Sequence, residues 1–159
     1  MQDHVLFEKD AEVGIIRLNR PEKKNALTLS MYRALITALD QAESEDGVRV
    51  ILITGTPDCF TAGNDLVDFA NAASDGPRDA VFFLEKLRAA QKPVIAAVEG
   101  LAIGIGTTML LHCDLVYAGV SSRLQLPFVN LGLCPEAGSS LIVPAVVGHQ
   151  RAAELLFFG

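Results

Sequence analysis

The sequence has few residues of the types that build disulfide frameworks or metal sites. Its three cysteines, Cys59, Cys113 and Cys134, are odd in number and form no C-x-x-C pair. We therefore expect free thiols in a reducing compartment, packed as small buried hydrophobic side chains. The three histidines show no metal-ligand spacing, so no metal is predicted.

A basic surface and long apolar segments are also absent. No apolar run reaches the length of a membrane span, and Met1 to Lys9 is too mixed for a signal peptide. The formal net charge of −6 argues against a nucleic-acid partner. Arg20, Lys23 and Lys24 form the one tight basic cluster, which also fits a solvated turn. We expect no membrane partner and a bacterial cytoplasmic location.

The residues that are present predict a globular α/β protein. Half of the 159 residues are hydrophobic and a fifth are charged, which is enough for one core and one domain over residues 1–159. Strands and helices alternate, so we expect stacked strand–strand–helix units. The predicted strands are Val5–Phe7, Val13–Leu18, Val48–Thr54, Val94–Val98, Leu115–Ala118 and Arg123–Leu126.

Helical spacing of apolar residues predicts the remaining elements. The first helix is expected to follow an N-cap at Ser30, and its buried stripe is expected to be Met31, Leu35, Ala38, Leu39 and Ala42. A later helix is expected at Asp79–Ala90, with a buried side made of Val81, Phe83, Leu84 and Leu87. The other helices are expected at Leu66–Ala70, Thr107–His112, Ser139–Val143 (ended by Pro144) and Arg151–Phe158, with loops at Thr56–Gly63 and Ala72–Pro77.

Two glycine-bearing turns follow buried strands. Gly104 and Gly106 open a helix, and Phe60–Leu66 (FTAGNDL) follows the strand that ends at Thr54. Backbone N–H groups at such turns are able to bind an anion, or a carbonyl oxygen that becomes one. The alternative for each turn is tight packing without a ligand.

Glu136 is the candidate acid. It lies among apolar neighbours, which would raise its pKa and suit a proton shuttle. The alternative is an acid that only favours a helix N-terminus. Asp65 is interpreted as an N-cap, and Thr107 and Thr108 as caps or pocket residues. Together these residues suit a reaction in which a carbonyl becomes an enolate.

Four stretches, in this order, carry a resemblance to a known family: NRPEKKNAL (Asn19–Leu27), FTAGNDL (Phe60–Leu66), PVIAAVEGLAIGIG (Pro93–Gly106) and PFVNLGLCPEAGSS (Pro127–Ser140). The chain from Val5 to Gly159 resembles the crotonase, or enoyl-CoA hydratase/isomerase, superfamily. The resemblance implies a spiral of strand–strand–helix units and a coenzyme A thioester as substrate. Coenzyme A is then part of the substrate, and no separate cofactor is expected.

The resemblance also implies roles for individual residues. The backbone N–H groups of Asn64 and Ile105 would be the oxyanion donors, and Glu136 the catalytic acid. The residues implied to contact the coenzyme A part are Lys23 or Lys24 near the phosphates, the carbonyl of Ala62 at the adenine, and Asp65 and Leu66 in the same region.

Two positions differ from typical hydratases. Where those enzymes carry glutamates, this chain has Thr108 and Phe128, whereas Glu136 matches the single acid of Δ3,Δ2-enoyl-CoA isomerases. The resemblance therefore implies an isomerase, with Thr108 and Phe128 in the substrate pocket. The alternatives are a hydratase or another crotonase-type reaction, and, from another class, a non-catalytic acyl-CoA binder or an inactive truncated form.

The last residues of the sequence carry apolar side chains that need to be covered. Arg151 to Phe158 has little polar face, so we expect a C-terminal helical region or a partner subunit to cover it. The resemblance implies a homotrimer or a dimer of trimers for the full-length form. In a eukaryote it implies a peroxisomal or mitochondrial location.

Overall fold

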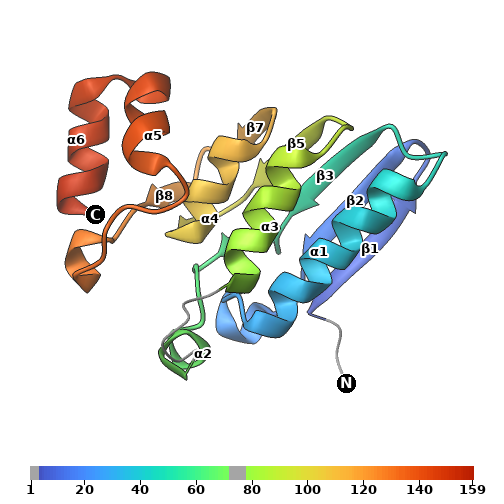
Figure 1. Ribbon diagram of the computed structural model, residues 1–159, viewed down its shortest axis with the longest axis horizontal. Helices are drawn as coiled ribbons and strands as arrows, with labels where there is room; N and C mark the ends of the chain where they lie inside the picture. The colour runs from blue at the N-terminus through green and yellow to red at the C-terminus, as the bar shows by residue number, and fades with distance from the viewer. Residues whose placement is uncertain (1–3, 72–77) are drawn as a thin grey trace.

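The computed structural model describes residues 4–71 and 78–159, which form two sheets with helices on one side (Figure 1). The larger sheet has the order β1-β2-β3-β5-β7 and the smaller one β4-β6-β8. Strands β1 and β2 are antiparallel, and the other pairs are parallel. The strands are β1 (Val5–Asp10), β2 (Val13–Leu18), β3 (Val50–Thr54), β4 (Cys59–Thr61), β5 (Val94–Val98), β6 (Leu101–Ile103), β7 (Leu115–Ala118) and β8 (Arg123–Gln125).

The chain winds through both sheets in turn. From β3 onward, each strand of the larger sheet is followed by one strand of the smaller sheet: β3 by β4, β5 by β6, and β7 by β8. This arrangement confirms the predicted α/β fold of stacked strand–strand–helix units. The prediction that residues 56–63 form a loop is wrong in part, because these residues contain β4. Strand β6 was not predicted. These strands of three residues each are held by pairing between distant segments, such as Cys59 with Leu101.

Two long helices cover one face of the larger sheet, and α5 and α6 lie beyond its β7 end (Figure 1). Helices α1 and α3 lie next to each other over the larger sheet (Figure 1). The α-helices are α1 (Leu29–Ser44), α2 (Leu66–Asn71), α3 (Arg78–Ala89), α4 (Ile105–Thr108), α5 (Ser139–Val147) and α6 (His149–Phe158); the 3₁₀ helices are η1 (Pro21–Lys23), η2 (Met109–His112) and η3 (Val129–Leu131). The loop predicted at Ala72–Pro77 lies outside the described residues.

Two predicted helix boundaries are wrong. Helix α1 is capped by Thr28 and not by Ser30, because the Thr28 hydroxyl accepts a hydrogen bond from the Met31 N–H at 3.3 Å. Pro144 lies inside α5 rather than at its end. Proline lacks an N–H but keeps its carbonyl, which accepts a bond from the Gly148 N–H at 3.0 Å and continues the helix.

The main core lies between α1, α3 and the larger sheet. The stripe predicted for α1 is buried, and Tyr32 is buried with it. In α3, Phe83 and Leu87 are buried, but Val81 is 54% exposed, contrary to expectation. The helical repeat of 3.6 residues places Val81 away from the side that faces α1.

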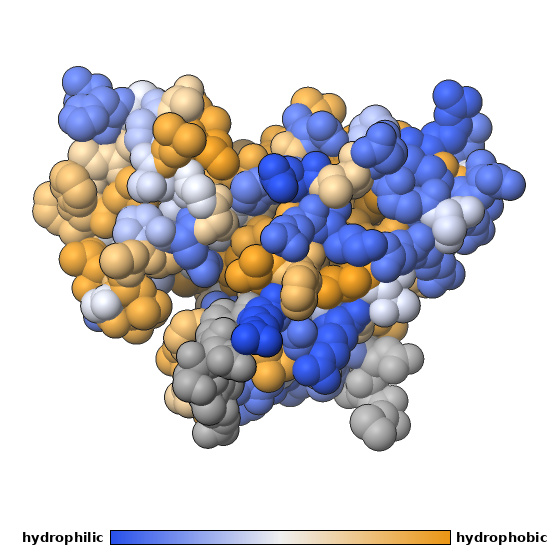
Figure 2. Space-filling model, in the orientation of Figure 1, coloured by the Kyte–Doolittle hydropathy of each residue, from blue (hydrophilic) through white to orange (hydrophobic). Residues whose placement is uncertain are grey.

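The C-terminal part packs around a smaller apolar cluster. Leu126, Phe128, Val143 and Ala152 bring η3, α5 and α6 together. Many apolar side chains in this part stay exposed, and Figure 2 shows them gathered over α5 and α6 at the left. Among the described residues, no helix is both long enough and apolar enough to cross a membrane.

Candidate active site

The two predicted glycine turns meet at the C-terminal ends of two strands of the smaller sheet. Strands β4 and β6 are parallel neighbours, so the turns after them start side by side. Gly63 has a φ of +92°, and a Cβ atom placed on it would lie 2.7 Å from the Ile103 carbonyl oxygen. The backbones of the two turns are therefore in direct contact, and only glycine fits at position 63 without a shift.

Each turn presents one unpaired backbone N–H group. Around Asn64, the Leu27 N–H donates to the Gly63 carbonyl and the Asp65 N–H donates to the Leu27 carbonyl, both at 2.8 Å. Ile105 is the first residue of α4, where N–H groups lack a partner within the helix. Within residues 4–71 and 78–159, neither the Asn64 nor the Ile105 N–H group has an acceptor.

Both N–H-bearing residues border one cavity of about 380 Å³. Its lining is mostly apolar and includes the side of Phe128, which is 5% exposed. Glu136 also borders this cavity. The structure thus brings together six of the predicted site residues: Ala62, Asn64, Leu66, Ile105, Phe128 and Glu136.

Glu136 is held in place by its own loop. The Ser139 N–H donates to the Glu136 carbonyl at 2.9 Å, and Ala137 follows with a left-handed φ of +52°. The His112 ring Nε2 lies 3.0 Å from the Ala137 carbonyl oxygen, so this nitrogen carries the hydrogen. Burial raises the pKa of the Glu136 carboxyl above its usual range, in the direction that the sequence predicted.

A second cavity lies on another side of Glu136. It has a volume of about 250 Å³, and Glu85, Arg88 and His112 are among its lining residues. Glu136 borders both cavities. The carboxyl group therefore stands between a chamber with two N–H donors and a second one that charged side chains partly line.

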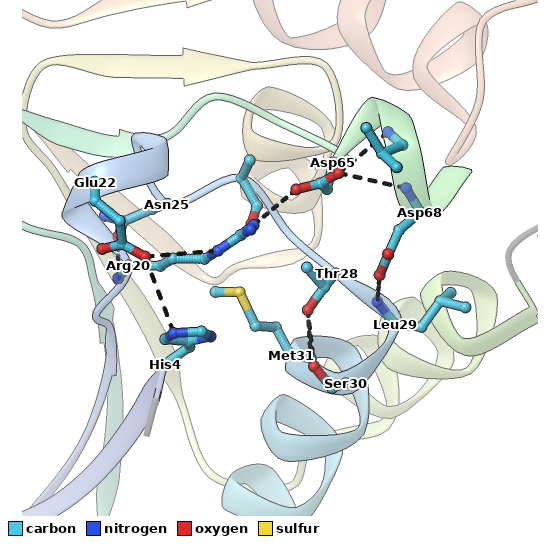
Figure 3. A network of polar contacts seen from close by, with 12 residues as sticks. His4, Arg20, Glu22, Asn25, Thr28, Leu29, Ser30, Met31, Asp65 and Asp68 are labelled. Atoms are coloured by element: carbon cyan, nitrogen blue, oxygen red, sulfur yellow. Dashed lines mark hydrogen bonds and ion pairs between the residues drawn. The ribbon is translucent and has the colours of Figure 1, made fainter. Parts of the chain in front are cut away.

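Asp65 fixes the first turn rather than bordering the cavity. Its carboxylate accepts bonds from the N–H groups of Val67 at 3.1 Å and Asp68 at 3.3 Å, which confirms its interpretation as an N-cap. It also accepts a hydrogen bond from the Arg20 guanidinium at 2.8 Å (Figure 3). This bond lowers the pKa of the Asp65 carboxyl. Asp68 in turn binds the Leu29 N–H at 3.1 Å, which ties α2 to the start of α1 (Figure 3).

The other predicted residues lie away from the cavity wall. Lys23 and Lys24 are exposed at η1, and the Lys24 carbonyl accepts a bond from the Ala62 N–H at 2.9 Å. Thr108 is fully buried, with its hydroxyl 3.5 Å from the Ile105 carbonyl. Unlike these residues, Cys134 borders the cavity; it is exposed, contrary to the expected burial.

Two residues that hold the site were not predicted. The fully buried Asn25 side chain donates to the carbonyls of Cys59 at 2.8 Å and Phe60 at 3.1 Å, which fixes the approach to the first turn. The Tyr32 hydroxyl donates to the side-chain oxygen of Asn64. Neither residue stands out from its neighbours in the sequence, because Lys24 and Ala26 flank Asn25, and Met31 and Arg33 flank Tyr32. No local pattern identifies a partner that is distant in the chain.

Comparison with known proteins places this site in a family. Residues 8–159 match the family model described as enoyl-CoA hydratase/isomerase. The chain is 38% identical to enoyl-CoA delta isomerase 2 of Rattus norvegicus over 163 residues, covering 98% of this chain and 41% of that protein. It thus spans less than half of that relative's length.

Solved structures show the same fold. OdaA of Pseudomonas aeruginosa is 50% identical with a TM-score of 0.91, over 99% of this chain and 64% of that one. The enoyl-CoA hydratase EchA8_6 of Mycobacterium marinum is 36% identical with a TM-score of 0.86, over 98% of this chain and 75% of that one. Similar proteins carry both isomerase and hydratase names. By its fold, its paired turns and this match, the chain belongs to the enoyl-CoA hydratase/isomerase family.

Proposed function

We propose that this protein acts on acyl-CoA thioesters as a Δ3,Δ2-enoyl-CoA isomerase, with Glu136 as its base. The observation that supports this choice is a single carboxylate on an apolar cavity that also holds two unpaired N–H groups. Where typical hydratases have glutamates, this chain has the buried Thr108 and the nearly buried Phe128. Addition of water requires an activated water and a proton donor, whereas isomerisation needs one group that moves one proton.

In the proposed reaction, the thioester oxygen accepts hydrogen bonds from the N–H groups of Asn64 and Ile105. Glu136 removes a proton from C2 of a 3-enoyl thioester, and the resulting dienolate is stabilised by these two donors. The same carboxyl then returns the proton to C4, which gives the conjugated 2-enoyl thioester. Phe128 excludes water from the dienolate, which favours isomerisation over hydration.

We assign the coenzyme A part to the region beside Ala62. The Ala62 carbonyl would accept a bond from the adenine amino group, and Leu66 and Asp65 would line the same region. The bond from the Ala62 N–H to the Lys24 carbonyl supports this assignment, because it joins the backbone of the lysine pair to a residue of the cavity wall. Exposed lysines suit the nucleotide phosphates.

The assay is the absorbance of the conjugated thioester formed from a 3-enoyl-CoA, with wild type beside Glu136→Gln. We expect Glu136→Gln to lower kcat by about 10²- to 10⁴-fold, because the amide cannot take up the proton. Glu85→Gln serves as the matched control, since Glu85 borders only the second cavity, and it should keep wild-type activity.

The mass of the product separates this proposal from hydration. Isomerisation leaves the mass of the thioester unchanged, whereas hydration adds one water. An active Glu136→Gln variant, or a product with added water, would contradict the proposal. Tight binding of an acyl-CoA without any turnover would favour a non-catalytic binder.

We further propose that the active form is an oligomer, in line with the homotrimer or dimer of trimers that the resemblance implies for the full-length form. Strand β7 supports this, because all four of its residues are exposed and it pairs with β5 on one side. An assembly would cover this strand and the apolar side chains of α5 and α6.

A further inference from the structure

Tyr32 is an aromatic residue of the core with a polar group aimed at the site. It is 1% exposed in α1, and its ring lies 5.9 Å from that of Phe83 at an angle of 48°. This packing between α1 and α3 fixes the ring, so the position of its hydroxyl is set by the core. Tyr32 does not border the 380 Å³ cavity. Its hydroxyl therefore acts through whatever it contacts.

That contact is the Asn64 carboxamide, whose oxygen accepts the Tyr32 hydroxyl hydrogen. The backbone on either side of Asn64 is tied to Leu27 by two bonds of 2.8 Å. The side chain is thus the part of Asn64 that is still able to rotate, and the bond from Tyr32 fixes it. With the carboxamide oxygen engaged, its NH₂ group has no acceptor in the part of the chain that the structure describes.

Glu136 borders the same cavity as Asn64, and its charge also affects Tyr32. Burial, and then the Glu136 carboxylate, raise the pKa of Tyr32 far above its usual range. Tyr32 therefore stays a hydrogen-bond donor throughout the working pH range of a typical enzyme. Through its bond to Asn64, the buried hydroxyl is linked to the cavity that Glu136 also borders.

We propose that Tyr32 is a positioning residue, whose buried hydroxyl holds the Asn64 carboxamide and so keeps the Asn64 N–H aligned with the thioester oxygen while Glu136 acts at C2. This inference rests on the proposed function for its reaction, but its geometry stands on Tyr32, Asn64 and Glu136 alone. The hydroxyl is not expected to touch substrate. It should affect the rate of the chemical step more than binding of the thioester.

The test is a double-mutant cycle with Tyr32→Phe, Asn64→Ala and the combined variant. Asn64→Ala removes the carboxamide and keeps the backbone N–H. We expect each single change to lower kcat roughly tenfold with little change in KM, which is the loss typical of one hydrogen bond. The combined variant should lose no more than the larger single effect, because both changes break the same contact. Thr37→Val removes an exposed hydroxyl of the same helix, which bonds the Arg33 carbonyl; it is the control and should leave kcat unchanged.

A merely structural role would give a different pattern. If Tyr32 only filled the core, Tyr32→Phe would keep its kcat, or its effect would multiply with that of Asn64→Ala. Either result overturns the inference. All variants are assayed well below their unfolding midpoints, measured by circular dichroism, so that loss of folded protein is not counted as loss of rate.

Binding of acetoacetyl-CoA separates this inference from the proposed function. Its enolate absorbs in the near ultraviolet, so it reports the N–H donors without isomerisation. A wild type that forms the bound enolate but does not isomerise 3-enoyl-CoA contradicts the proposed function. The cycle is then read from the amount of enolate at saturation, and the same non-additive pattern supports the role of Tyr32. A wild type that does neither contradicts both.

Discussion

At the scale of single residues, Glu136 shows a conflict between stability and function. It is half-buried, and this burial raises the pKa of its carboxyl. A carboxylate with a raised pKa is a better proton shuttle near neutral pH, but its charge destabilises the folded protein. The site therefore keeps a group that the fold alone does not favour.

Replacing Glu136 with Gln should stabilise the protein at neutral pH. The folded-state pKa lies above the unfolded value of about 4.3, so the wild type is relatively most stable below that pH and loses stability as pH rises through the folded pKa. Glutamine does not titrate. The difference in unfolding free energy, measured by urea denaturation at pH 4 and pH 8, should favour the variant more at pH 8.

The matched control is again Glu85→Gln, which should not show this pH-dependent gain. An equal effect of Glu136→Gln at both pH values would contradict a buried, titrating carboxyl. The same raised pKa predicts that the acidic limb of kcat/KM in the wild type lies above the usual range of a glutamate.

At the scale of elements, the site depends on how closely two turns approach. The turn after β4 and the turn after β6 touch at Gly63, and α4 lies against β4 at Gly106. A Cβ atom on Gly106 would lie 2.5 Å from the Thr61 methyl group. Both glycines lie in turns for which the sequence left two interpretations open, ligand binding and tight packing. The structure shows that they are also the points where backbone layers meet.

Gly63→Ala should therefore push the two turns apart. We expect a loss of about 1–3 kcal/mol in unfolding free energy from backbone strain and collision with the Ile103 carbonyl. Because a displacement of about 1 Å in a site can cost 10²-fold in rate, kcat should fall by about that factor. Urea denaturation and the isomerase assay measure the two effects.

Gly132→Ala is the control that separates the effect of backbone strain at a positive φ from the effect of a collision with the neighbouring turn. Gly132 has a similar positive φ of +66°, but a Cβ atom there meets nothing within 4 Å. It should cost stability by strain alone and leave kcat close to wild type. If the two variants behaved alike, the contact between the turns would not be what positions the N–H groups.

At the scale of the whole molecule, polar and apolar surfaces are separated. The side over α1 is polar, whereas apolar side chains gather over α5 and α6 (Figure 2). Strand β7 adds an open edge, with Val116 41% and Tyr117 64% exposed. An open apolar edge strand tends to pair with another chain.

Val116→Lys should reduce self-association without unfolding the protein. A lysine on an edge strand opposes pairing, and an exposed substitution usually changes stability by no more than about 0.5 kcal/mol. Sedimentation velocity at several concentrations should show a smaller average mass for this variant than for wild type. Val120→Lys, at a fully exposed position after β7, is the control. Equal masses for all three proteins would contradict an interface at β7.

The sequence by itself determined the elements and the chemistry of the site. Apolar periodicity is a local property, so it was sufficient to predict the long strands, the buried face of α1 and the two glycine turns. Four local motifs were sufficient to identify the superfamily. Glu136 was found because its apolar neighbours adjoin it in the chain.

Only the tertiary structure decided what depends on contacts between distant segments. The pairing of β4 with β6, the contact of Gly63 with Ile103, and the bond from Tyr32 to Asn64 join residues up to 42 positions apart. No local pattern encodes which distant partner a buried hydroxyl or a strand of three residues will meet. That choice is made by the packing of the whole core, because the same residue types are compatible with many partners until the chain has folded.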